Sequence, residues 1–314
     1  MRRRHRSAWW VALGAVGAAC LAVACATHYR PEHPVQLTTS AAGLSGMTIG
    51  PDGGLWAVPE EARTLLRLDP VTGAVRSFPI VGMPADLEAE ALAWRPGPNG
   101  GELVIGTETD GPSRPSDDLV ILDFDGQFAH VREMVRCPYG LWHLQGQHNR
   151  GIEGLCAVGR DLVVAAEITG EENGRRYAPL GRRDDDGRWN AHRVWLSSDT
   201  GKISGVECRL LDDGVAEVFA IERHFGVLRI LRFVLPPLPD GAGSSTAPTS
   251  MDEVPALTPE VVLNLDRWAQ SRDPSPNFEG ITFLEDGRLA LLSDNHYRGE
   301  LSGPSELWFV ALPE

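Results

Sequence analysis

Five acidic residues recur at one position of a repeated pattern, and carboxylates with this spacing could bind a cation or take part in catalysis. Each ends the second of two apolar runs that flank a turn; they are Glu60, Glu108, Glu167, Glu222 and Asp294. The matching first runs open on Ser45, Glu90, Glu153, Ser204 and Glu279. If these positions meet in space they form a ring of carboxylates, which repel one another and raise their own pKa values unless a cation lies among them.

Calcium suits such a ring, because it takes about 6–8 oxygen ligands and tolerates irregular geometry. We therefore expect Ca²⁺ as the cofactor, with these metal ligands: Glu90, Glu108, Glu167, Glu222 and Asp294. Glu153 and Glu279 are expected to be further ligands or the general base, and Arg223 to grip a phosphate group. Three alternatives stay open. Each carboxylate could cap backbone amides of a neighbouring unit, pair with arginines of the protein itself, or bind a cationic ligand.

The repeated segments predict β-hairpins. Segment 276–295 is the clearest, because Asp286-Gly287 separates two apolar runs and glycine tolerates the positive φ of tight hairpin turns. Glu279 and Asp294 are equidistant from that turn, so a regular hairpin would place them opposite one another. Further strand-like runs follow most hairpins, residues 170–188 are expected to form a polar rim loop, and residues 35–314 show no sustained helical periodicity.

Repeating four-stranded meanders of about 40–45 residues predict an all-β fold, a β-propeller. We expect five or six four-stranded blades, with residues 35–39 completing the last blade so that the N- and C-terminal strands close the ring. The first strand of each blade lies nearest the axis in this fold. The hairpin ends, and with them the carboxylates, should therefore gather on one rim of the central channel.

The N-terminus predicts export. Residues 1–25 combine an arginine-rich start with an apolar run of small residues, as in a secretory signal. Cys25 follows Ala22-Val23-Ala24, which resembles the processing box of bacterial lipoproteins, so the protein is expected in the periplasm or cell envelope, lipid-anchored at Cys25 or otherwise secreted. The predicted division is a signal at 1–25, a tether and closing strand at 26–40, and the propeller at 41–314.

Charge and cysteine usage narrow the function further. The chain has 29 Lys and Arg against 43 Asp and Glu, a net charge of −14, which argues against binding the phosphate backbone of nucleic acids. Outside the signal, the cysteines are Cys137, Cys156 and Cys208. We expect a Cys137–Cys156 disulfide, with three free thiols as the alternative. There is no G-x-S-x-G nucleophile elbow and no zinc-type Cys/His spacing.

The hairpin motifs resemble those of a known family, the bacterial exported phytase-like propellers labelled "esterase-like activity of phytase". The similarity lies in Asn277-Phe278-Glu279-Gly280 through Ser293-Asp294-Asn295. It extends to Glu153-Gly154-Leu155 with Glu167, and to Glu222-Arg223. Ser45 and Ser204 depart from the acidic openings that would strengthen a metal site. The resemblance implies phytase or esterase activity.

These observations lead to one functional prediction and its rivals. We expect a monomeric, calcium-dependent hydrolase of a phosphoester or other ester. Its ligand should be a small molecule or phosphoester, and it should not bind nucleic acid. It should contact the membrane only through a lipid anchor at Cys25. The main rival is a non-catalytic propeller that binds a ligand or envelope partner through the same rim, since this fold serves many functions. A lactonase- or sugar-oxidase-like propeller enzyme is a third reading.

Overall fold

The structure, a computed structural model, describes residues 31–97, 100–109, 111, 113–211, 214–237, 253–297, 300–301 and 303–313. The predicted signal at residues 1–25, including Cys25, lies outside these residues. Strands dominate these residues, which also include the helical turn η1 (Tyr139–Trp142) and the short helix α1 (Asp266–Gln270). Within the described part, no helix is long and apolar enough to cross a membrane.

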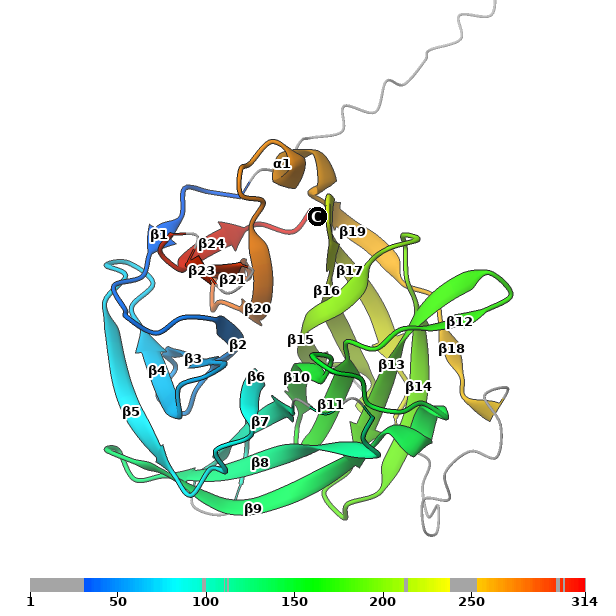
Figure 1. The fold of residues 1–314 in the computed structure, drawn as a ribbon, viewed down its shortest axis with the longest axis horizontal. Coiled ribbons are helices and arrows are strands. Elements are labelled where there is room, and N and C mark those ends of the chain that lie inside the picture. Colours follow the sequence, from blue (N-terminus) through cyan, green and yellow to red (C-terminus); the bar gives the residue numbers. More distant parts are fainter. Residues whose placement is uncertain are drawn as a thin grey trace, which may run out of the picture.

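The strands form five meanders arranged around a central axis (Figure 1). The first blade contains β2 (Leu44–Ile49), β3 (Leu55–Pro59), β4 (Thr64–Leu68) and β5 (Val75–Val81). The second contains β6 (Glu88–Arg95), β7 (Glu102–Glu108), β8 (Ser116–Phe124) and β9 (Ala129–Pro138). The outer strands β5 and β9 pair in parallel and join these two blades into one sheet.

The other three blades follow the same plan. The third contains β10 (Ile152–Val158), β11 (Asp161–Ala166), β12 (Gly170–Glu172), β13 (Arg175–Arg183), β14 (Trp189–Trp195) and the added β18 (Ala256–Leu257). The fourth contains β15 (Lys202–Leu210), β16 (Ala216–His224), β17 (Val227–Leu235) and β19 (Glu260–Asn264). The fifth contains β20 (Asn277–Phe283), β21 (Leu289–Asp294), β24 (Glu306–Val310) and β1 (Val35–Gln36). A small ribbon, β22 (His296–Tyr297) with β23 (Glu300–Leu301), lies apart.

The predicted β-propeller fold and its closure are therefore confirmed. The innermost strands β2, β6, β10, β15 and β20 contact one another in turn around the axis, and β20 returns to β2. Strand β1 pairs with β24, with Val35 opposite Leu307, so an N-terminal strand completes the C-terminal blade. Of the five or six blades expected, the described residues form five.

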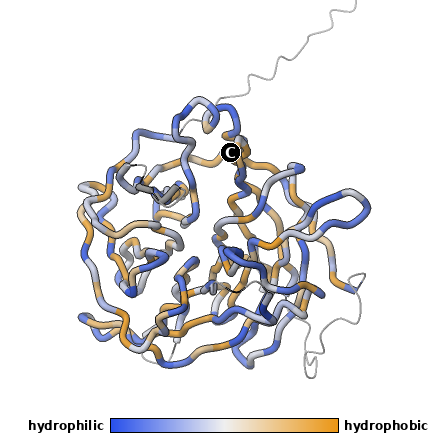
Figure 2. The backbone as a smooth tube through the Cα atoms, in the orientation of Figure 1, coloured by the Kyte–Doolittle hydropathy of each residue, from blue (hydrophilic) through white to orange (hydrophobic). Residues whose placement is uncertain are grey.

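The hydrophobic core is divided among the spaces between adjacent blades. Five clusters of buried apolar side chains each combine residues of two neighbouring blades. The apolar residues follow the strands, whereas the β12–β13 hairpin that projects from the edge is hydrophilic (Figure 2). The prediction of a rim loop over residues 170–188 was wrong, because most of this polar stretch pairs as β12 and β13.

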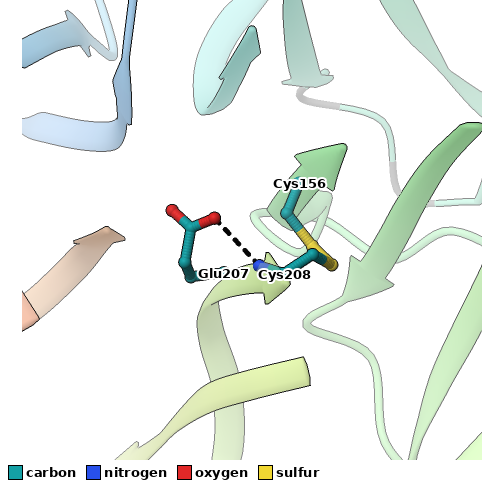
Figure 3. The surroundings of a disulfide bond; sticks show 3 residues. All are labelled: Cys156, Glu207 and Cys208. Atoms are coloured by element: carbon teal, nitrogen blue, oxygen red, sulfur yellow. Dashed lines mark hydrogen bonds between the residues drawn. A yellow bond between two sulfur atoms is a disulfide. The ribbon is translucent and has the colours of Figure 1, made fainter. Parts of the chain in front are cut away.

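The disulfide prediction was also wrong. Cys156 of β10 bonds to Cys208 of β15 (Figure 3). Cys137 is a buried free thiol. Cys156 and Cys208 are 52 residues apart in sequence but lie on neighbouring innermost strands. Sequence proximity favoured Cys137, whereas the packing of adjacent blades selects Cys208.

Glycines allow the innermost strands to approach closely around the axis. A Cβ added at Gly46 would lie 2.2 Å from the backbone nitrogen of Leu92 on the next blade. A Cβ at Gly205 would lie 2.6 Å from the carbonyl oxygen of Glu279. Both neighbours are backbone atoms, so relief would require two blades to move apart.

We predict that Gly46→Ala lowers the free energy of unfolding by about 1–3 kcal/mol, because the added methyl overpacks the contact between two blades. Denaturant unfolding would measure the change. Gly140→Ala is the matched control, since a Cβ there meets no atom within 4 Å, and it should change stability by less than about 0.5 kcal/mol. Equal stability of the two variants would contradict the account of blade packing.

Candidate functional site

Each of the five innermost strands is bulged at the residue that opens its repeat. The antiparallel registers shift at Ser45–Gly46, Glu90, Glu153, Ser204 and Glu279. A bulge inserts an extra residue into one strand and re-aims its side chain. The five repeats thus carry the same irregularity at one level of the axis, and the polar opening residues gather there.

The bulge corrects one expectation about the lead hairpin. Glu279 has no partner directly across from it; instead Asn277 lies opposite Asp294, and Phe278 opposite Ser293. The Asn277 amide bridges the two acids, donating to Glu279 Oε1 at 3.1 Å and to Asp294 Oδ2 at 2.8 Å. A regular hairpin would have placed the carboxylates face to face, whereas the bulge places them side by side.

Three carboxylates come together at this level. Glu60, Glu279 and Asp294 each offer an oxygen, and these oxygens lie within 4.8 Å of one another. Arg223 donates to Glu279 from the fourth blade, and its Nε has no hydrogen-bond partner among the described residues. We call the three carboxylates together with Arg223 the acidic mouth. It fits a hard cation because every ligand atom that the carboxylates offer is an oxygen.

Two more of the expected ligands lie beside the acidic mouth. Glu90 is buried and accepts the Ser45 hydroxyl at 2.9 Å, and the same hydroxyl lies 3.2 Å from Glu279. Glu108 is buried near Glu153. Neither belongs to the group of three oxygens close enough to share an ion.

The remaining two expected ligands are held by the protein itself. Glu167 forms an ion pair with Lys202 of the next blade. Glu222 is fully buried and accepts four hydrogen bonds, from the backbone amides and hydroxyls of Ser197 and Ser198, at 2.5–3.0 Å. These are the contacts expected of a carboxylate that caps a neighbouring loop.

Burial and like charge shift the pKa values at the acidic mouth. Burial raises the pKa of Glu60 to about 9, and the charges of Glu279 and Asp294 add to the shift. Burial also raises the pKa of Glu90 well above its ordinary value, and that of Glu108 to about 8, with the charge of Glu153 contributing to both. The site therefore holds protons that a bound cation would displace.

Glu153 differs from these groups because cations lie near it. Burial raises its pKa to about 7, while Lys202 and Arg223 oppose the shift and Glu279 adds to it. A carboxylate with a pKa near neutrality is suited to act as a general base at physiological pH.

Basic residues gather next to the acidic mouth on the third and fourth blades. Burial lowers the pKa of His224, and nearby cations lower it further; these are Lys202, Arg176, Arg223 and Arg150. One side of the axis thus offers carboxylates and the other offers cations. Such a pair of surfaces can hold a metal ion and an anionic group together.

Sequence reasoning assigned no site role to three participants. Glu60 shares the hairpin-end position of the other acids, so the repeat could have added it to the ligands. Asn277 was seen only as part of a motif, although it lies two residues from Glu279. Lys202 carried no signal, because its place beside Glu167 depends on how the third and fourth blades pack.

The fold and this mouth define the class of protein: a five-bladed β-propeller with a cluster of carboxylates on its axis. A family model described as "Phytase-like: Esterase-like activity of phytase" matches residues 39–297, which is most of the chain. The chain belongs to this phytase-like family. No curated protein matches its sequence.

Solved structures show distant similarity. The PQQ-bound aldose sugar dehydrogenase of Streptomyces coelicolor is 14% identical, with 90% of this chain and 100% of that chain covered and a TM-score of 0.49. A streptogramin B lyase is 13% identical, with 91% of this chain and 98% of the lyase chain covered, and the TM-score is 0.39. The virginiamycin B lyase of Staphylococcus aureus is 14% identical, with 84% of this chain and 67% of the lyase chain covered, and the TM-score is 0.34. Similarities at this level carry no argument about the reaction of this chain.

The pKa of Glu60 predicts how stability changes with pH. Between its ordinary value of 4.5 and about 9, the folded carboxyl keeps a proton that the unfolded one has released. The folded state therefore loses stability as the pH rises through this window. We predict that Glu60→Gln raises the melting temperature of metal-free protein relative to wild type by more at pH 9 than at pH 5.

Thermal melts at both pH values in the presence of a chelator would measure this difference. Glu61→Gln is the control, because Glu61 is the exposed neighbour. A Glu60→Gln effect that is independent of pH would contradict the inferred protonation of Glu60.

Proposed function

We propose that this chain is an exported, calcium-dependent hydrolase that cleaves a phosphoester at the acidic mouth. The observation that carries the proposal is the group of Glu60, Glu279 and Asp294 oxygens within 4.8 Å, next to Arg223. Membership of the phytase-like family supports hydrolysis as the type of reaction. The proposal of export rests on the signal-like residues 1–25. We also propose that the protein is a monomer, and that it is either lipid-anchored at Cys25 or released.

The carboxylates fit calcium by their chemistry. Burial and the charges of Glu279 and Asp294 raise the pKa of Glu60, so a cation bound among the three carboxylates would replace its proton. Asn277 holds two of them in position through its amide hydrogen bonds. Bound there, Ca²⁺ would act as a Lewis acid that polarises a phosphoryl oxygen and lowers the pKa of water.

Other residues supply the remaining functions. Glu153, with a pKa of about 7, would take the proton from attacking water. Arg223 and Lys202 would stabilise the charge on the phosphoryl oxygens, provided that the substrate draws them away from Glu279 and Glu167. A cavity of about 220 Å³ adjoins the acidic mouth, and Asn277, Asp294, Arg272 and Trp308 line it. It would hold the part of the substrate beyond the scissile group.

We predict that Glu279→Gln lowers calcium affinity and phosphoester turnover by about 100-fold or more, because it removes one charge from the three carboxylates. Calorimetric titration of CaCl₂ into chelator-treated protein would measure binding, and p-nitrophenyl phosphate would report turnover. p-Nitrophenyl acetate in parallel would report carboxylester cleavage.

Asp286→Asn is the matched control, since Asp286 is an exposed acid at the tip of the same hairpin, and it should leave both quantities unchanged. Unaltered calcium affinity in Glu279→Gln, together with a lower melting temperature, would reject the metal site and leave this carboxylate a structural role. Calcium binding without turnover of either ester would instead indicate a propeller that recognises a ligand and does not cleave it.

A further inference from the structure

The axis has a second mouth at the opposite end of the innermost strands. A cavity of about 370 Å³ opens there, and all five blades contribute to its wall. We call it the far mouth, and its principal lining residues are Ile49, Trp94, Cys156, Glu207, Arg209 and Phe283. Its volume lies within the range of small-molecule sites, which is about 300–1,000 Å³.

An apolar constriction separates the two mouths. Two residues beyond each bulge, every innermost strand places one buried apolar side chain at the same level; they are Met47, Leu92, Leu155, Val206 and Ile281. The space among them is only about 10 Å³, roughly the room of a single water. A ligand in the far mouth would therefore occupy a site distinct from the acidic mouth.

Glu207 gives the far mouth its charge. The Cys208 amide donates to Glu207 Oε1 at 2.9 Å, and the second carboxylate oxygen points away from the disulfide (Figure 3). The Thr282 hydroxyl and the Phe283 amide also donate to Glu207. Burial nevertheless raises its pKa to about 7, and these three hydrogen bonds only partly offset that shift.

Glu207 forms no ion pair within the described part of the chain, whereas the buried carboxylates Glu102 and Asp117 each form one. Glu102 pairs with Arg95, and Asp117 pairs with Arg114. Arg209, the other charged residue of the far-mouth wall, donates to Glu217 at 2.6 Å. The far mouth therefore holds one carboxylate whose charge no protein cation balances, and a buried charge of this kind is costly.

The rest of the wall indicates what kind of cation would fit. A single carboxylate gives too few oxygens for a divalent metal ion. The rings of Trp94 and Phe283, with Ile49 and the Cys156–Cys208 disulfide, offer apolar and aromatic surface beside that charge. Aromatic faces attract cations. An organic cation would use both the charge and the rings.

We propose that the far mouth binds a small organic ammonium ion with an apolar body, whose charge pairs with Glu207 and whose body packs against Trp94 and Phe283. The assignment rests on the cavity, the apolar constriction and the unbalanced carboxylate. It does not depend on the proposed metal site.

Benzylamine and benzyl alcohol are suitable probes, because they share a ring and differ in charge. Calorimetric titration of the full chain at about pH 8 should give benzylamine at least tenfold higher affinity than benzyl alcohol. In Glu207→Gln, which keeps an acceptor for the Cys208 amide, the two probes should bind within about threefold of each other. Glu133→Gln, at an exposed outer-strand carboxylate, should keep the wild-type preference.

The proposal would be overturned if wild-type protein failed to bind benzylamine, or if it preferred benzylamine to benzyl alcohol by less than threefold. This test uses no variant, so it does not depend on whether Glu207→Gln folds. An unchanged preference in Glu207→Gln would overturn it too. Hydrolysis of p-nitrophenyl phosphate should be unaffected by Glu207→Gln, since the constriction lies between the mouths. The two proposals can therefore fail separately.

Discussion

Close packing of five strands around one axis is the constraint on which the rest of this molecule depends. At Gly46 and Gly205 the backbone of one blade fills the space that a Cβ would take. Each innermost strand then bulges at one level, where the extra residue turns a polar side chain out of the regular alternation. The acidic mouth is thus a consequence of how the ring closes. No single blade contains it, since Glu60, Arg223 and Glu279 come from three different blades.

The cost of this arrangement is electrostatic. Buried carboxylates at close range cannot all be ionised, so protons, protein cations or a metal ion must neutralise them. The protein does part of this itself, through Arg223 with Glu279 and Lys202 with Glu167. Glu60 has like charges among its neighbours, and burial together with those charges raises its pKa to about 9. The uneven distribution of cations makes one side of the axis suited to a metal ion and the other to an anion.

The two ends of the axis differ although the same five strands build both. At one end the bulges gather acids and nearby bases, and at the other the strands supply rings, a disulfide and the single acid Glu207. Met47 and Leu92, with their counterparts on the other strands, close the passage between them. This separation lets one scaffold carry two environments of different polarity, so a ligand at one end need not disturb the other.

The sequence by itself determined the fold class, the closing role of the N-terminal strand and the approximate position of the candidate site. Local signals sufficed for these features, because Asp-Gly turns, alternating apolar runs and a recurring acid at each hairpin end act within a few residues of one another. Glu279 and Asp294 were recognised in this way. The same signals supported a Cys137–Cys156 disulfide and an acid from every blade as a calcium ligand.

Only the tertiary structure decided which acids share a site and which are held elsewhere. Glu222 is capped by Ser197 and Ser198, and Glu167 is paired with Lys202, because of how the third and fourth blades pack. The same packing joins Cys156 to Cys208. Hairpin position fixes a residue's height along the axis, but its partners come from the adjacent blade, far away in sequence. A local pattern carries no information about them.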